Sequence, residues 1–181
     1  MEDDIGLVER YIAGETDAIE ELVMRYQKQI YAFIYRMTKD MEESKDLTQK
    51  TFLNAVKGIR DFRKTASFKT WLYQIAVNTS LNHIKRDKRE EVEFEDSVAS
   101  SQSGALTSIL ENEKREQVRK SLDTLPERQK LAVILRVYES LSCAETARAM
   151  GCSEGTVKAH YHSGVKKLKE VLKEKDYEFS S

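Results

Sequence analysis

Residues 68–89, FKTWLYQIAVNTSLNHIKRDKR, contain no glycine or proline that would interrupt a helix. At about 100° per residue, one side of such a helix carries an apolar stripe suited to packing on a core. The stripe consists of Phe68, Leu72, Ile75, Ala76, Thr79 and His83. Another side, within an arc of about 80°, carries Trp71, Gln74, Asn78, Asn82, Lys85 and Arg89. The stretch therefore predicts a helix with one buried face and one polar face.

The side chains of the polar face have the chemistry that nucleic acid requires. Arginine and lysine bind phosphates, asparagine and glutamine pair with adenine edges, and tryptophan stacks on an unpaired base. A solvated polar face beside an ordinary buried tryptophan would show the same pattern. The stretch alone leaves both interpretations open.

The composition extends the helical prediction to the whole chain. Of the 181 residues, 40% are apolar and 34% are charged, with one proline and seven glycines. No segment shows the alternation of a strand. We expect an all-α fold with helices over residues 2–13, 17–37, 42–57, 68–86 and 110–122, followed by a helix that starts at Pro126 and a C-terminal pair.

Charge is distributed in blocks, although the net charge is only −1. Residues 57–89 and 156–175 carry net charges of +7 and +4, and residues 90–113 carry −7. Two basic blocks separated by an acidic spacer indicate two contacts with a polyanion. Chance clustering in a highly charged helical protein remains the alternative.

Residues 140–173, SLSCAETARAMGCSEGTVKAHYHSGVKKLKEVLK, predict a helix-turn-helix. Ser142 and Glu145 fit a capping box, Gly151 ends the first helix, and Ser153 caps the second. The outer face of the second helix then carries residues suited to reading DNA. They are Ser153, Thr156, Lys158, Ala159, His162, Ser163, Lys166 and Lys167. A helical hairpin with a solvated lysine-rich side is the alternative.

Metal binding, catalysis and membrane insertion find no support in the pattern. His160 and His162 lie about 200° apart on a helix, and Cys143 and Cys152 do not form a C-x-x-C unit. No catalytic grouping stands out, so we expect no enzyme and no cofactor. The two cysteines, the acidic N-terminus and the lack of a long apolar run predict a reduced, cytoplasmic protein.

Together these segments resemble the extracytoplasmic-function (ECF) sigma factors, the two-domain class of bacterial RNA polymerase specificity subunits. The similar stretches are AIEELVMRYQKQIYAFIYRM, DLTQKTFLNAVKGIRDFR, FKTWLYQIAVNTSLNHIKR and LPERQKLAVILRVYESLSCAETARAMGCSEGTVKAHYHSGVKKLKEVL. The resemblance implies an N-terminal domain over residues 1–89, a flexible acidic linker over residues 90–110 and a C-terminal domain over residues 111–181. A stand-alone helix-turn-helix regulator is the alternative function.

The resemblance also implies roles for residues of the N-terminal domain. It assigns Asp46, Gln49, Phe52 and Asn54 to binding of core RNA polymerase. It assigns recognition and melting of the −10 promoter element to Arg60, Phe62, Arg63, Ser67, Phe68, Lys69, Trp71, Gln74, Asn78, Asn82, Lys85 and Arg86. Core packing is an equally good interpretation of Phe52, and an open one for Phe62 and Phe68.

The same resemblance assigns reading of the −35 element to the helix-turn-helix. Family members often have arginine where this chain has Ser163, which leaves the base preference open. The linker either imitates nucleic acid in the polymerase cleft or is a solvated tether. The implied partners are core RNA polymerase, promoter DNA and an anti-sigma factor.

Overall fold

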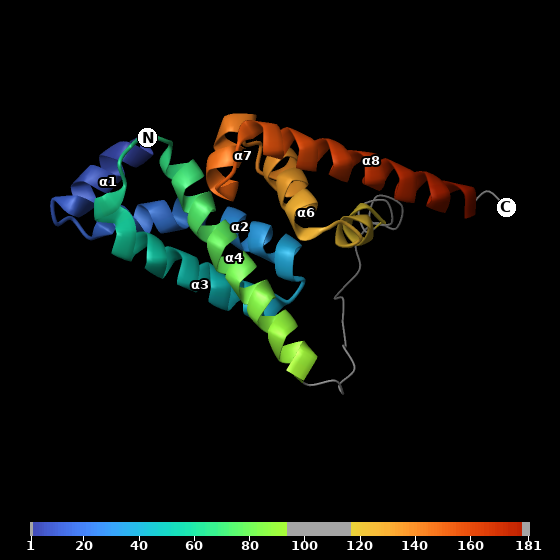
Figure 1. The fold of residues 1–181 in the computed structure, drawn as a ribbon. Helices are drawn as coiled ribbons and strands as arrows, with labels where there is room; N and C mark the ends of the chain where they lie inside the picture. The colour runs from blue at the N-terminus through green and yellow to red at the C-terminus, as the bar shows by residue number, and fades with distance from the viewer. Residues whose placement is uncertain (1, 94–116, 179–181) are drawn as a thin grey trace.

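The computed structural model describes residues 2–93 and 117–178, and every regular element in these ranges is helical (Figure 1). The prediction of an all-α fold is confirmed. Within the described ranges, no helix is both long and apolar enough to cross a bilayer. The acidic linker predicted over residues 90–110 lies almost entirely outside the described residues.

Four helices and one 3₁₀ turn form the N-terminal domain. Their bounds are α1 Asp4–Ile12, α2 Asp17–Thr38, α3 Met41–Gly58, η1 Ile59–Asp61 and α4 Phe68–Glu93. The Asp3 side chain accepts a hydrogen bond from the Gly6 amide at 2.8 Å, and that of Asp40 accepts one from Glu43 at 2.9 Å. These two carboxylates satisfy amides at the starts of α1 and α3.

Helix α3 ends at Gly58, one residue beyond the predicted bound. Gly58 has a φ of −94°, and the backbone continues directly into η1. Lys39 takes a left-handed conformation, with φ 66°, between α2 and α3. This single residue reverses the chain without a glycine.

The C-terminal domain contains the predicted helix-turn-helix. Residues 117–123 are helical, and the further elements are α6 Glu127–Val133, a π-helical turn η2 Ile134–Tyr138, α7 Cys143–Met150 and α8 Glu154–Glu178. Pro126 caps α6 rather than occupying its first position. The capping box is present, because the Glu145 carboxylate accepts from the Ser142 amide at 2.8 Å and Ser142 Oγ accepts from the Glu145 amide. Gly151 ends α7 with φ 62°, as predicted.

The two domains pack against each other and share one hydrophobic core. Leu22 and Phe33 of α2 and Leu72 of α4 belong to the same buried cluster as Leu131 and Met150 of the C-terminal domain. In Figure 1, α7 lies beside the first turns of α4, while α8 extends away from the N-terminal domain.

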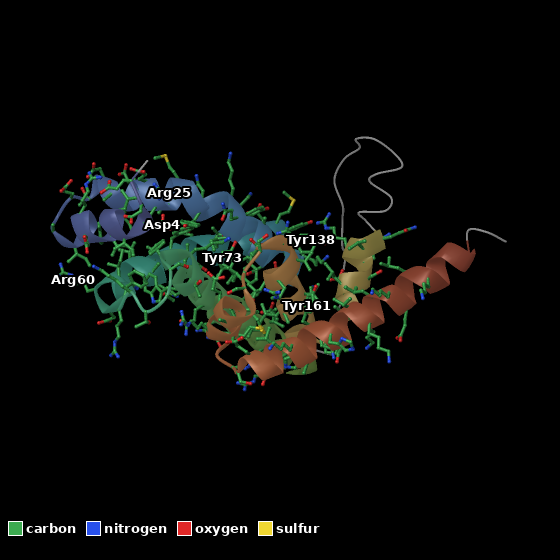
Figure 2. The ribbon with its side chains drawn as sticks, turned by 90° about the horizontal axis from the view of Figure 1, so that it is seen from above. Asp4, Arg25, Arg60, Tyr73, Tyr138 and Tyr161 are labelled. Atoms are coloured by element: carbon green, nitrogen blue, oxygen red, sulfur yellow. The ribbon has the colours of Figure 1, made fainter. Side chains whose placement is uncertain are left out.

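Polar contacts also cross the boundary between the domains, and they converge on Glu139, at the end of η2. The Tyr73 hydroxyl and Arg36 Nη1, the latter at 3.2 Å, donate to its carboxylate, and Lys69 Nζ donates to its carbonyl at 2.8 Å. A buried carboxylate is costly unless hydrogen-bonded donors surround it. Tyr73 lies where the N-terminal helices meet the C-terminal ones (Figure 2).

Candidate nucleic-acid interface

The polar face predicted for α4 is present. Its core stripe is buried through Phe68, Leu72 and Ala76. On the predicted polar face, Trp71 is half-buried and the remaining residues are exposed. These exposed residues are Gln74, Asn78, Asn82, Lys85 and Arg89. The face is therefore available for a ligand along several turns of helix.

Trp71 rests on two phenylalanines of the predicted site. Its ring centroid lies 5.2 Å from that of Phe62 and 5.7 Å from that of Phe68. Phe62 is 8% exposed and Phe68 2% exposed, so both rings are largely covered by the protein. Core packing, the alternative that the sequence left open, describes both residues. They support Trp71, whose own ring remains partly accessible.

A pocket of about 390 Å³ lies beside Trp71, at the loop before α4. Its lining residues are Asp61, Phe62, Arg63, Thr65, Ala66, Thr70, Trp71, Gln74 and Arg148. Arg60, labelled in Figure 2, is exposed at the edge of the N-terminal domain. Ser67 Oγ accepts from the Thr70 amide at 3.1 Å and thereby caps α4. Lys69 does not join the exposed group, because it donates to Glu139.

The four predicted polymerase contacts fall on two sides of α3. Gln49 and half-buried Phe52 line an apolar groove of about 910 Å³ between α2 and α3. Asp46 and Asn54 line a polar groove of about 580 Å³ between α3 and α4, which also contains Asn78, Asn82 and Arg86. The structure therefore brings Asp46 and Asn54 to the predicted DNA-reading residues rather than to Gln49 and Phe52.

Sequence reasoning missed the exposed apolar residues of the groove between α2 and α3. Met24 is 66% exposed and Leu53 is 53% exposed, and both line this groove. The available signal was an apolar residue on each helix outside the core stripe. Arg148 and Glu139 were also missed, because both act through residues of the other domain.

The exposed face of α8 carries all the residues predicted to read duplex DNA. Ser153 Oγ accepts from the Thr156 amide at 3.1 Å and caps the helix. The exposed residues are Ser153, Thr156, Lys158, Ala159, His162, Ser163, Lys166 and Lys167. Val157 is 1% exposed and Gly164 is buried against α6, so the opposite side of α8 is held by the core. This arrangement matches a recognition helix seated on its domain.

Several groups at or near the domain boundary have shifted pKa values, Glu139, Lys130 and Glu145 among them. Burial raises the pKa of the Glu139 carboxyl and lowers that of the Lys130 ammonium. Hydrogen bonds from the backbone and side chain of Ser142 lower the pKa of Glu145. Among the described residues, no group of three histidine, cysteine or acidic side chains is placed to hold a metal ion.

Both halves of the chain match known protein families. Residues 22–90 match Sigma-70 region 2, and residues 115–168 match Sigma-70, region 4. The chain is 35% identical to the RNA polymerase sigma-H factor of Pseudomonas aeruginosa, with 88% of each protein covered. It is 33% identical to the ECF RNA polymerase sigma-E factor of Escherichia coli strain K12, covering 86% of this chain and 87% of that relative.

Two solved structures share the fold. One is CnrH in complex with the cytosolic domain of CnrY, with a TM-score of 0.71 and 21% identity over 94% of this chain and 97% of that one. The other is the sigma factor RpoE in complex with the anti-sigma factor NepR from Bartonella quintana, with a TM-score of 0.69 and 24% identity over 85% and 96%. The matches to both sigma-70 regions and the identity to named sigma factors lead to one conclusion: the chain belongs to the ECF sigma factors of the sigma-70 family, which are not enzymes but direct promoter-specific transcription initiation.

Proposed function

We propose that this sigma factor divides initiation among three surfaces of its own. The pocket at Trp71 and the polar face of α4 bind the −10 element as it opens. The exposed face of α8 reads the −35 element, and the groove between α2 and α3 binds the clamp of core RNA polymerase. One observation carries the proposal. Trp71 packs on two phenylalanines and remains partly accessible, and exposed carboxamides and cations follow it along the same face of α4.

Melting requires a group that compensates for the lost stacking of a flipped base. Stacking of a base on an aromatic ring contributes about 1–3 kcal/mol, and extrusion of a base costs a few kcal/mol, an amount of the same order. Trp71 supplies the ring, and the pocket beside it supplies the space. Gln74 and Asn78 follow on the same face, where their amides reach the edges of unpaired bases.

The melting role is tested with Trp71→Ala, Trp71→Phe and Asn78→Ala in reconstituted holoenzyme. Permanganate footprinting of unpaired thymines on a promoter mapped for this factor reports opening. We expect Trp71→Ala and Asn78→Ala to reduce opening, and Trp71→Phe to restore most of it because phenylalanine retains a stacking face. Equal opening in all three variants would contradict the role of Trp71.

The −35 role rests on the exposure of α8 and on its basic charge. Lys158→Ala and His162→Ala are expected to change the preferred −35 bases, measured by selection from a randomised duplex library. Lys169→Ala is the matched control, because Lys169 is another exposed cation of α8 outside the reading positions. A base preference that moves equally in all three variants would contradict reading by Lys158 and His162.

The clamp role rests on the apolar groove between α2 and α3. Met24→Asp places a charge in this groove and is expected to abolish capture of the sigma factor on immobilised core polymerase. Met41→Asp is the matched control, since Met41 is 57% exposed, lies outside the groove and starts α3, where an acidic residue is favourable. Retained binding by Met24→Asp would contradict this placement of the clamp.

The complete proposal is tested by adding the purified protein to core polymerase with genomic DNA and sequencing the transcripts. Defined start sites preceded by a shared sequence are expected, and their absence would overturn it. A stand-alone regulator would bind duplex DNA and fail to bind core polymerase, and the match to Sigma-70 region 2 does not favour it.

We further propose an anti-sigma factor as a partner and the cytoplasm as the place of action. The support is the likeness to RpoE and CnrH, whose structures contain NepR and the cytosolic domain of CnrY. Co-purification from the native cell, followed by mass spectrometry, tests the partner. Recovery of the chain with core polymerase alone would argue against an anti-sigma factor.

A further inference from the structure

The loop that borders the Trp71 pocket contains a lysine in an unfavourable backbone conformation. Lys64 has a φ of 56°, in the left-handed region. Glycine adopts this region freely, whereas a residue with a Cβ is destabilised there. Two loop residues on each side of Lys64 line the pocket, namely Phe62, Arg63, Thr65 and Ala66. The direction that the chain takes at Lys64 therefore decides where this part of the pocket wall lies.

A carboxylate of α1 contacts the side chain of this lysine. The Lys64 ammonium donates to the Glu9 carboxylate and forms an ion pair with it. The two side chains are 43% and 60% exposed, so water screens the pair and its contribution is small. A small contribution is enough here, because the left-handed conformation is unfavourable for lysine by a free energy of the same order.

Helix α1 is a firm support for this contact. Leu7 and Val8 of α1 are 0% exposed, and Arg25 of α2 donates to the Asp4 carboxylate at 2.6 Å (Figure 2). The turn η1, which leads into the loop, also contacts α1. The loop is thus fastened to a helix that precedes residues 22–90, the part of the chain that matches Sigma-70 region 2.

We propose that α1 shapes the strand-binding pocket, with Glu9 as a positioning residue that holds Lys64 in its left-handed conformation. Glu9 acts through the backbone of the loop rather than on the strand itself. The link to melting rests on the proposed function of the Trp71 pocket, whereas the hold of α1 on the loop depends only on the contacts between them. In the competing role, Glu9 merely neutralises a lysine that would otherwise bind a phosphate, and this role predicts the opposite effect on melting.

The hold on the loop is measured in the free, full-length protein by acrylamide quenching of Trp71, the single tryptophan of the chain. Loop residues line the pocket beside its ring, so a looser loop admits the quencher. Glu9→Gln and Lys64→Gln are expected to raise the quenching constant. Glu15→Gln is the matched control, because Glu15 is an exposed glutamate whose ion pair, at 2.8 Å, joins it to Arg10 of α1 rather than to the loop. Unchanged quenching in Glu9→Gln would overturn the proposal.

The effect on melting is measured in reconstituted holoenzyme by permanganate footprinting. Glu9→Gln and Lys64→Gln are expected to reduce opening by about two- to fivefold, which corresponds to the loss of one exposed ion pair, and Glu15→Gln should not change it. Increased opening in Glu9→Gln would show a lysine freed to bind phosphate and would overturn positioning. Raised quenching with unchanged opening would refute the role of the pocket in melting, while the hold of α1 on the loop would stand.

Glycine at position 64 separates a backbone role from a charge role. Lys64→Gly removes the ammonium but adopts the left-handed conformation freely, so it is expected to retain most of the opening that Lys64→Gln loses. Adding Glu9→Gln to Lys64→Gly should cause no further loss, because the glycine no longer needs the carboxylate. If Lys64→Gly is as impaired as Lys64→Gln, the ammonium itself is required and Glu9 is not a positioning residue.

Discussion

Replacement of Gly164 by alanine tests how closely α8 must approach the helix that supports it. A Cβ at this position would lie 2.9 Å from Val133 Cγ2 and 3.4 Å from the Gln129 carbonyl oxygen. Val133 is 3% exposed and β-branched, so it has little freedom to move away. Relief of the overlap therefore requires a shift of α8 against α6.

The expected magnitude is a difference between two opposing effects. Overpacking of a core costs about 1–3 kcal/mol, and replacing glycine by alanine inside a helix contributes about 1 kcal/mol of stability. Gly164→Ala should therefore be destabilised by about 1 kcal/mol. For a chain of this size, that change lowers the melting temperature by about 2–4 °C.

Gly155 of the same helix provides the control. A Cβ there would meet its nearest neighbour, Ser153 Oγ, at 3.7 Å, which is ordinary van der Waals contact. Gly155→Ala should therefore leave the melting temperature unchanged or raise it slightly. Thermal unfolding followed by far-ultraviolet circular dichroism measures both variants. If Gly164→Ala is as stable as Gly155→Ala, the close contact between α6 and α8 does not limit their packing.

Three further predictions concern the domain boundary and the exposed face of α8. Tyr73→Phe and Tyr26→Phe each remove a buried hydroxyl that donates to a carboxylate, and each should lower the free energy of chemical unfolding by about 2 kcal/mol. Only Tyr73→Phe should accelerate amide exchange in α7, because the carboxylate that Tyr73 contacts lies in the other domain. The folded pKa of Glu139 is raised from 4.5, so its carboxyl stabilises the fold below pH 4.5 and loses this effect as pH rises through its folded pKa. The folded pKa of Glu145 is lowered from 4.5, so its carboxyl stabilises the fold above pH 4.5 and loses this effect as pH falls through its folded pKa. The melting-temperature difference between wild type and Glu139→Gln should thus shrink with rising pH, and that for Glu145→Gln should grow; parallel trends would contradict the assigned pKa directions. Binding of duplex DNA should weaken steeply with salt, and Lys166→Ala should reduce the slope of log K against log salt by about 1 if Lys166 contacts a phosphate.

The sequence predicted best what depends on neighbouring residues. The capping box at Ser142, the left-handed end of α7 at Gly151 and the buried stripe of α4 all follow from local spacing, and all are present. The exposed face of α8 follows from the same periodicity. Local chemistry is enough here because each feature is completed within one or two turns of helix.

Features that depend on distant partners were not predictable. Tyr73 is fully buried although it lies outside the predicted stripe of α4, because Glu139 and the C-terminal helices cover it. The predicted polymerase contacts are divided between two grooves because α2 and α4 lie on different sides of α3. One groove contains Gln49 and Phe52, and the other contains Asp46 and Asn54. The periodicity of one helix shows which residues share a side, but it does not show which neighbour each side contacts.

The π-helical turn over Ile134–Tyr138 makes this factor sensitive to a single deletion. A wide turn contains one more residue than an α-helical turn, and here the Glu139 amide bonds to the Ile134 carbonyl at 3.2 Å. Loss of Val137, which is 53% exposed, would remove little buried surface but would restore ordinary winding and rotate Glu139 by about 100°. A chain one residue shorter at this point would keep the polar face of α4 and the exposed face of α8 but lose the carboxylate bonds between the domains. The length of this turn therefore decides whether the Glu139 carboxylate reaches Tyr73 and Arg36 across the domain boundary.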